Sequence, residues 1–554
     1  MGKFAKGLIL LLISGTLFGA PKGQMYFFLA QNKIDKAVEL YKAQYEEDQK
    51  HDPEFIEDLA MHLLKAGIKS EEAEEQLLAL YGVSFGSTSN AITLCDLAMR
   101  SGGPLTQLAT IQLLGQLQDD RCEELLVRAF SSQFLQIRFE AGFQLALRKA
   151  KQATGLFQSL MHHLPDELHV FFPDLFALVG TKDALSHLQR LLTHKNKYVQ
   201  LASVLAIANH RRDDFLPQIR SLLTHRDPAE QEAAIYAIGM LQDLDSKKTL
   251  IKLKDSPIPN VRIAAYSSLI YLGDHTVFEE VKQLARTKDP FAISLLRNVP
   301  TAQDALAALL YDADQTVRFN AAIALLNHRD PRAIPILMEI LINDSKDYGL
   351  YPLRSLGNTM QCWKMLPSKE AFDKVSKTNI SAITTSFREY ILQECAQYSE
   401  PSFLRIAKEI FDKRQNDLIP STVHLLEAIG SKEAHSLLRK YAEHAGAPLI
   451  RDYCRLALFR AGIYQGAILD EWLDKKTSAP LIKFRPLISW TERSTENSSY
   501  SLTPEEESRL YIETLMSIAE KHTDSGVNTL LTLITDGNKQ NRYAIAGLLL
   551  HAIQ

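Results

Sequence analysis

The chain lacks a large excess of charge of either sign. It contains 62 Lys and Arg against 66 Asp and Glu, a net charge of −4 over 554 residues. A dedicated nucleic-acid-binding protein needs a strong cationic excess to neutralise phosphates, so we expect no nucleic-acid partner. Glycine (25) and proline (21) are scarce and 46% of residues are apolar, which excludes collagen-like and disordered chains. The length therefore implies several folded domains or one repeat array.

Cysteine is also rare, and its pattern excludes a dense disulfide framework. The cysteines are odd in number and include no Cys-x-x-Cys pair. We expect them to be core residues, with one disulfide as an open alternative: Cys95, Cys122, Cys362, Cys395 and Cys454.

Long apolar runs are absent after the first twenty residues, so the later sequence predicts no membrane span. In residues 1–20, Lys3 and Lys6 precede the apolar stretch from Gly7 to Phe18, and Ala20 follows, as in a secretory signal peptide. Cleavage after Ala20 would leave bulky Phe18 at the −3 position. An uncleaved N-terminal anchor and a buried helix are therefore alternatives. We expect an exported protein of the periplasm or extracellular space, with membrane contact only through this segment if it stays uncleaved.

The middle of the sequence repeats every 31 residues. Units begin at Thr106, Ile137, Leu168, Val199, Glu230 and Val261. Eight residues after each start the residue is apolar: Leu114, Leu145, Phe176, Ile207, Ile238 and Leu269. Twenty residues after each start the same holds: Leu126, Phe157, Leu188, Ile219, Leu250 and Val281. Two amphipathic helices per unit, with no strand period, predict an all-α solenoid of stacked helix pairs.

Two segments carry a family resemblance. Residues 260–265 (NVRIAA) and 316–322 (TVRFNAA) are similar to the "VRxxAA" signature of HEAT repeats, in the short form also found in phycobilisome lyases. The resemblance covers about residues 100–465 and implies an armadillo-like superhelix of helix pairs. It is weak evidence for function. A helical hairpin before the array resembles, weakly, a tetratricopeptide unit.

These patterns predict a domain order along the chain. It comprises a signal peptide (1–20), a helical N-terminal cap (21–99), the solenoid (100–466), an irregular Pro/Ser-rich excursion (467–503) and a C-terminal helical cap (504–554). We expect a unit shortened by six residues around Pro290 to Pro300. The period resumes at Tyr348, with Leu356 and Gly357 in register. Thr503 and Pro504 are expected as the N-cap and first residue of the last cap.

Catalytic patterns are few. The sequence has no P-loop, HExxH motif or dinucleotide fingerprint, and no His-Glu dipeptide such as the HEAT-like hydroxylases carry. Residues 82–86 match GxSxG around Ser84, but only helical patterns flank them, so a connector is the better interpretation. A polar cluster could supply metal ligands: His162, His163, Asp166, Glu167 and His169. It straddles Pro165 at a turn between helices, where solvated polar residues are expected, so solvated turn residues are the better interpretation. We expect no catalytic residue, metal or cofactor.

One surface pattern suggests a binding site. Cations recur on the outward side of the second helices and farther along them: Arg190, Arg220, Lys252, Lys282, His194, His225, Lys254 and Arg286. Second helices usually line the concave wall of HEAT solenoids, so the resemblance implies a basic groove for an acidic protein or an anionic envelope polymer. Helix-terminal cations that only complement dipoles are the alternative, and Glu279 and Glu280 partly offset the row.

The signature arginines have a structural interpretation. Arg138, Arg262, Arg318 and Arg451 begin first helices, where a guanidinium can bridge turn carbonyls or an Asp such as Asp289 or Asp314. Taken together, the sequence predicts an exported, non-enzymatic HEAT-like scaffold that binds another protein. The alternatives are an accessory lyase or hydrolase and a membrane-anchored envelope assembly factor.

Overall fold

The computed structural model describes residues 21–342, 349–366, 380–464, 481–486 and 502–554. The expected signal segment (1–20) and most of the expected Pro/Ser-rich excursion (467–503) lie outside these ranges. The chain divides into two compact units: unit 1 is Met1–Leu156 with Gln465–Gln554, and unit 2 is Phe157–Tyr464. In the described ranges, no helix combines the length and apolarity that crossing a bilayer requires.

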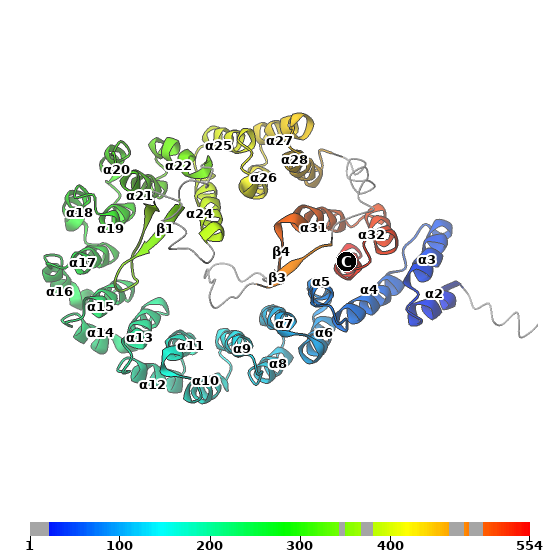
Figure 1. Ribbon diagram of the computed structural model, residues 1–554, viewed down its shortest axis with the longest axis horizontal. Helices are drawn as coiled ribbons and strands as arrows, with labels where there is room; N and C mark the ends of the chain where they lie inside the picture. Colours follow the sequence, from blue (N-terminus) through cyan, green and yellow to red (C-terminus); the bar gives the residue numbers. More distant parts are fainter. Residues whose placement is uncertain (1–20, 343–348, 367–379, 465–480, 487–501) are drawn as a thin grey trace, which may run out of the picture. The chain divides into compact units, whose positions relative to one another are not determined.

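Unit 1 joins helices from both ends of the chain (Figure 1). Its N-terminal helices are α2 (Pro21–Ala30), α3 (Ile34–Asp48), α4 (Pro53–Ile68), α5 (Ala73–Val83), α6 (Thr88–Ser101), α7 (Pro104–Gln116), α8 (Arg121–Ala129) and α9 (Leu135–Leu147). The next helix, α10 (Ala153–His162), crosses the division between the units. The C-terminal helices are α31 (Glu506–Ala519), α32 (Asp524–Asp536) and α33 (Arg542–Ala552).

The C-terminal helix α33 packs against α4 and α5. Two glycines permit this approach, because a Cβ on Gly82 of α5 would lie 2.7 Å from the Tyr543 carbonyl oxygen of α33, and Gly547 of α33 faces Gly82 directly. The helices expected as an N-terminal cap (21–99) and those expected as a C-terminal cap (504–554) therefore pack against each other within unit 1. The apolar faces of both ends are buried against each other instead of each covering one end of an array.

A short two-stranded sheet precedes α31. Strands β3 (Phe484–Pro486) and β4 (Leu502–Pro504) pair antiparallel, and the Phe484 ring stacks on Tyr81 of α5 with centroids 4.4 Å apart. Thr503 and Pro504 therefore belong to a strand, and Glu505 is the N-cap of α31. The predicted cap position was wrong because strand pairing fixes these residues in an extended conformation.

Unit 2 is a row of helix pairs. Its first helices are α11 (Phe172–Val179), α13 (Lys197–Asn209), α15 (Pro228–Met240), α17 (Pro259–Tyr271), α19 (Pro290–Leu295) and α21 (Gln315–Leu326). Its second helices are α12 (Lys182–Leu191), α14 (Leu216–Leu222), α16 (Lys247–Leu253), α18 (Phe278–Ala285), α20 (Gln303–Leu309) and α22 (Ile334–Ile342). Beyond them lie α24 (Ile380–Cys395), α25 (Glu400–Asp412), α26 (Ile419–Ile429), α27 (Lys432–His444) and α28 (Pro448–Arg460).

The 31-residue period is confirmed. All twelve apolar positions at eight and twenty residues from the unit starts have no exposed surface. The N-caps Asn196, Asp227, Ile258 and Asp289 follow one another at 31 residues, and Asp314 follows after 25. The predicted shortening of one unit is thus also confirmed. It falls on α19, which has 6 residues where α17 has 13.

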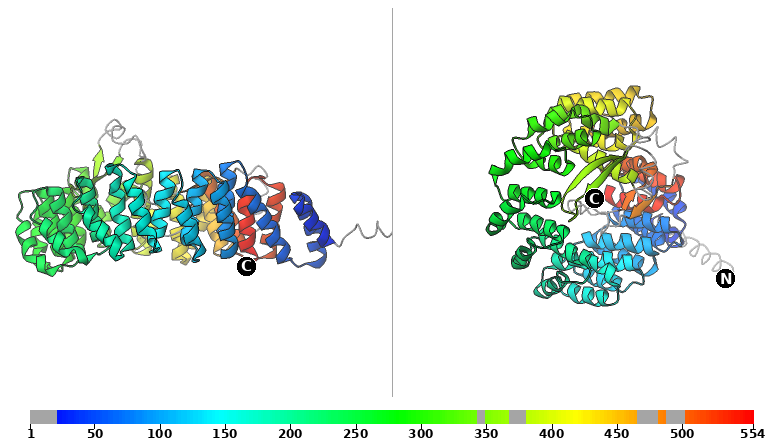
Figure 2. Two further views of the ribbon diagram at one scale, coloured as in Figure 1. Left: turned by 90° about the horizontal axis from the view of Figure 1, so that it is seen from below. Right: turned by 60° about the vertical axis from the view of Figure 1, so that its left-hand side comes forward.

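A β-hairpin interrupts the helices of unit 2. Strands β1 (Gly349–Arg354) and β2 (Gln361–Leu366) pair antiparallel, and β2 contacts α19 and α21. Figure 2 shows the hairpin on the inner side of the row, against the first helices. The expected absence of strands and the helical repeat unit expected to include Leu356 are therefore wrong here. Tyr348, the expected start of that unit, lies outside the described residues. Leu356, assigned to a core position, is 59% exposed at the hairpin turn.

Candidate functional site

The expected basic groove does not lie on the concave side. Arg190, Arg220, Lys252 and Lys282 lie on α12, α14, α16 and α18, which form the outer row of unit 2, while α13, α15 and α17 form the inner row (Figure 1). Small residues explain this arrangement: a Cβ on Gly239 of α15 would lie 2.8 Å from Ser268 Oγ of α17. First helices that approach so closely make the shorter, inner layer of the curve.

Four of the eight outer cations lie beside carboxylates. Arg220 Nη2 lies 2.5 Å from Asp243 Oδ1 and 3.0 Å from Asp245 Oδ2, and this guanidinium lowers the pKa of Asp243. Lys254 Nζ lies 2.6 Å from Glu280 Oε2, and Lys282 pairs with Glu279.

The remaining members of the row differ in their partners. His225 Nδ1 lies 3.0 Å from Glu230 Oε2, and Arg286 Nη1 donates to Gln283 Oε1 over 3.0 Å. Arg190 and Lys252 make no ion pair within the described part of the chain. Overall, the row links the outer turns of the stack more than it presents free positive charge.

The signature arginines contact turn carbonyls. Arg138 Nε donates to the Phe130 oxygen (3.2 Å), Arg262 Nη1 to Ser256 (3.2 Å) and Arg318 Nη1 to Asp312 (2.9 Å). Arg451 differs, because its Nε donates to its neighbour Asp452 over 3.2 Å. Asp289 and Asp314 serve as N-caps, accepting amide hydrogens of α19 and α21.

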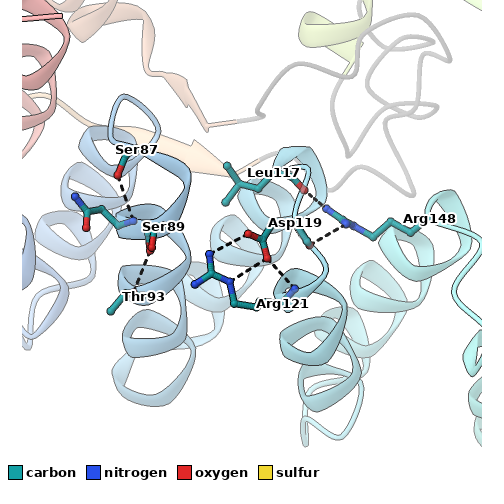
Figure 3. Close-up of polar contacts among 8 residues, drawn as sticks. Ser87, Ser89, Thr93, Leu117, Asp119, Arg121 and Arg148 are labelled. Carbon is teal, nitrogen blue, oxygen red and sulfur yellow. Dashed lines mark hydrogen bonds and ion pairs between the residues drawn. The ribbon is translucent and has the colours of Figure 1, made fainter.

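A second set of arginines closes the ends of first helices. In unit 1, Arg148 after α9 donates to the carbonyl oxygens of Leu117 and Leu114, the latter over 2.8 Å. Nearby, a two-point contact with Arg121 lowers the pKa of Asp119 to about 2 (Figure 3). In unit 2, Arg212 Nε donates to the Ala177 oxygen of α11 over 2.8 Å. These contacts satisfy carbonyls left unpaired at a helix end.

The histidine cluster assembles differently from the sequence hypothesis. Asp166 and His169 meet His194, a member of the outer row, with ligand atoms within 4.8 Å of one another. His169 Nε2 lies 2.9 Å from the Met161 carbonyl oxygen, so Nε2 carries the ring proton and donates it there. The other ring nitrogen of His169, Nδ1, is then the acceptor for His194 Nε2 over 3.3 Å. His194 Nδ1 in turn accepts the Asn196 amide hydrogen over 3.1 Å.

This hydrogen-bond chain fits a metal ion poorly. To ligate through Nε2, His194 would need its proton on Nδ1, where it would face the Asn196 amide hydrogen. His162, His163 and Glu167 are exposed and lie outside the cluster. The described geometry therefore favours a structural relay of hydrogen bonds.

Ser84 and the cysteines lack the environment of nucleophiles. Ser84 ends helix α5 and donates its hydroxyl to the Tyr81 oxygen over 2.6 Å, whereas a nucleophile elbow requires a preceding strand. All five cysteines are free and buried. Burial raises the pKa of Cys362 and of Cys395 to about 12, which keeps both thiols protonated and unreactive.

A cleft of about 440 Å³ opens on the inner side of unit 2. One wall comes from the inner helices α15, α17, α19 and α21, and the other from β1, β2, their connecting turn and α24. Six of the lining side chains are aromatic: Tyr236, Tyr271, Phe291, Trp363, Phe387 and Tyr390. The position and lining make this cleft the best candidate for a binding site.

The aromatic side chains form a stacked wall. The Trp363 and Phe387 rings lie 3.6 Å apart between centroids at 26°, and Phe387 lies 6.2 Å from Tyr390 at 23°. Tyr390 and Tyr271 are 43% and 39% exposed. Burial raises the pKa of Tyr390 and of Tyr236, so both hydroxyls stay protonated and able to donate.

The hairpin is held to the inner helices by polar contacts. Glu232 of α15 has no exposed surface and accepts hydrogen bonds from Ser355 Oγ, Thr359 Oγ1 and, over 2.9 Å, the Gly357 amide. Asn320 of α21 accepts the Trp363 amide hydrogen over 2.9 Å and donates to the Trp363 oxygen over 2.6 Å. The wall of the cleft is therefore anchored at two points.

The charge of the lining has one sign. Among the described lining residues Arg297 and Arg354 are charged, and none is Asp, Glu, His, Lys or Cys. Arg354 Nη1 donates to Asn358 Oδ1 over 3.0 Å. Within the described ranges Arg297, Asn298 and Asn327 make no side-chain hydrogen bond, so their donors face the cleft without a partner.

None of the lining residues was predicted from the sequence, although their spacing carries a signal. Tyr236 and Ser267 lie six residues after the unit starts Glu230 and Val261, and Ile323 lies six residues after Val317, which begins the unit that follows the shortened one. Tyr271 and Asn327 lie ten residues after them, one helical turn farther on the same face. This face was overlooked because the first helices were assigned to the convex side.

The comparisons with known proteins agree with the fold. The family model described as "HEAT repeats" matches three overlapping or adjoining stretches, residues 184–270, 216–294 and 291–351. No curated protein sequence matches the chain.

Solved structures with similarity to the chain include the complex of CpcE and CpcF of phycocyanin lyase from Nostoc sp. PCC7120. It shows 18% identity, covers 39% of this chain and 92% of that chain, and has a TM-score of 0.28. The crystal structure of Kap121p shows 13% identity, covers 95% of this chain and 62% of that chain, and has a TM-score of 0.36. Human deoxyhypusine hydroxylase shows 14% identity, covers 64% of this chain and 98% of that chain, and has a TM-score of 0.21. Such distant similarities carry no information about function.

The stacked helix pairs and their 31-residue period define the chain as an α-solenoid protein. More particularly, it contains HEAT repeats, which are matched within residues 184–351.

Proposed function

We propose that this protein is an exported, non-enzymatic scaffold that binds a segment of a protein partner in the cleft of unit 2. The observation that carries the proposal is the combination along one concave surface of exposed aromatic rings with Arg297, Asn298 and Asn327, which make no side-chain hydrogen bond within the described part of the chain. The volume of about 440 Å³ falls within the usual range of binding sites.

The chemistry of the lining favours binding over catalysis. The cleft offers the hydroxyls of Ser267 and Ser294, and its described lining has no carboxylate, imidazole or amine that could act as a general base beside them. The Thr359 hydroxyl donates to Glu232, which is fully buried behind the hairpin turn and also accepts hydrogen bonds from Ser355 and Gly357. Guanidinium groups stay protonated and cannot accept a proton.

Export is the second part of the proposal. It rests on Lys3, Lys6 and the apolar stretch from Gly7 to Phe18. Mass spectrometry of the mature protein's N-terminus tests it: a chain beginning at Pro21 supports export with cleavage. An intact Met1 in a membrane fraction would instead support the anchored envelope factor, and an intact Met1 in the cytosol would refute export.

Site-specific photo-crosslinking tests the binding site. A photoreactive phenylalanine analogue is placed at Tyr271 in the cleft, or at Tyr311, which lies outside the cleft and is 90% exposed. We expect the Tyr271 probe to capture one defined protein and the Tyr311 probe to capture none. Capture through Tyr311 alone, or through neither position, would contradict the proposed site.

A further inference from the structure

We infer that the cleft of unit 2 binds an extended peptide segment that carries an Asp or Glu side chain, and that Arg297 and Arg354 receive the carboxylate. This inference rests on the proposed function and specifies the chemistry of the partner.

Charge complementarity is the first argument. Arg297 and Arg354 are exposed and reach the same cleft, whose described lining contains no carboxylate. The nearby Glu232 is fully buried and already accepts hydrogen bonds from the hairpin turn, so it does not occupy either arginine. A planar guanidinium pairs with a carboxylate through two parallel hydrogen bonds, which makes such an anion the fitting ligand.

The amide side chains are the second argument. Asn298 and Asn327 line the cleft without a side-chain hydrogen bond in the described chain, and Gln361 lies exposed at the start of β2. A carboxamide presents both a donor and an acceptor, which match the amide and carbonyl groups of an extended backbone. The aromatic rings beside them offer flat apolar surface to the intervening side chains.

The dimensions of the cleft limit the segment. Its lining runs across four successive inner helices, α15, α17, α19 and α21. Neighbouring packed helices lie roughly 8–10 Å apart, so the lining spans about 25–30 Å. An extended chain rises about 3.3 Å per residue, which corresponds to at most about nine residues.

An anionic polymer fits the structure less well. A repeating anion needs a continuous row of free cations. The row on the outer helices is interrupted, because four of its eight members lie beside carboxylates, among them Arg220 and Lys254. The cleft offers two charges among neutral amides and aromatic rings, a pattern suited to one or two carboxylates in a peptide.

Two peptide libraries test the inference on the full chain. Both consist of biotinylated nine-residue peptides with amidated C-termini, and they differ only in Glu or Gln at the central position. We expect the protein to retain the Glu library at least tenfold better at low salt, with a smaller preference at 0.5 M salt. The Arg297→Glu, Arg354→Glu double variant should lose or invert this preference.

The outer row supplies the matched control. Arg190→Glu with Lys252→Glu makes the same charge change outside the cleft, at residues without an ion pair in the described chain, and should leave the preference unchanged. Arg297→Gln with Arg354→Gln removes the charges more gently, in case the reversed variant fails to fold, and should abolish the preference.

Other outcomes overturn the inference. Equal retention of the two libraries by the wild-type protein would refute the acidic preference, while capture of a protein through Tyr271 would leave the proposed function intact. Loss of the preference in the outer-row variant would move the anion site to the convex side. Binding of inorganic polyphosphate that resists the cleft substitutions, with no peptide retained, would favour an anionic polymer instead. No peptide retained and no capture through Tyr271 would refute both proposals.

Discussion

Removing the Glu232 carboxylate should release the β-hairpin from the inner helices. Glu232 lies on α15, and its partners Ser355, Gly357 and Thr359 lie more than 120 residues later in the chain. Glu232→Ala leaves two hydroxyls and one amide without this acceptor. Gly357 supports the same contact, because a Cβ there would lie 2.8 Å from the Ala229 oxygen of α15.

The expected magnitude follows from these hydrogen bonds. Each bond to a charged group contributes about 1.5–3 kcal/mol. The three losses do not add fully, because the hydroxyls can turn to water once the turn lifts from α15 and because Ser355 Oγ also accepts the Met360 amide hydrogen. We therefore expect a loss of about 3 kcal/mol in the free energy of docking, a roughly 100-fold rise in the undocked population.

Hydrogen exchange detected by mass spectrometry measures this population. Peptides that cover residues 355–366 should exchange roughly 100-fold faster in Glu232→Ala, while peptides from α17 keep their rates, because undocking is local. Glu140→Gln in unit 1 alters a second fully buried glutamate that does not touch the hairpin, and should leave these rates unchanged. Unchanged hairpin exchange, or equal acceleration across all of unit 2, would refute the anchoring role of Glu232.

Three further predictions concern packing, pH and thiols. Gly547→Val should destabilise unit 1 by about 1–3 kcal/mol in urea denaturation, because an added side chain there would collide with Gly82 of α5. Gly155→Ala should cause no such loss, because the space that its added Cβ would fill is open. Burial and the neighbouring His169 lower the pKa of His194 below its usual range, so the unfolded chain binds the proton first as the pH falls. Stability should therefore fall as pH drops through about 6.5, and His194→Asn should flatten this dependence; an unchanged slope would count against the relay. The five buried thiols should resist a thiol reagent at pH 8 in the native protein and all react in urea, and fewer than five would indicate a disulfide.

The sequence by itself determined the repeat architecture of the array. A residue such as Ile238 or Leu269 is fully buried because its place in a 31-residue helix pair puts it on the apolar face, and this depends on local periodicity alone. The shortened unit at α19 was visible for the same reason. So was the contact of Arg262 with a nearby turn carbonyl, since its partner lies 6 residues away.

Only the tertiary structure decided which helix layer is concave, how the chain ends pack and where the cleft lies. The first helices form the concave layer because Gly239 lets α15 approach Ser268 of the next unit closely. The two ends of the chain pack together in unit 1 where Gly82 of α5 meets Gly547 of α33. The hairpin forms the second wall of the cleft because the buried Glu232 receives a turn 123 or more residues away in sequence. Contacts of such long sequence separation leave no periodic trace, because nothing in the spacing of either segment specifies the other.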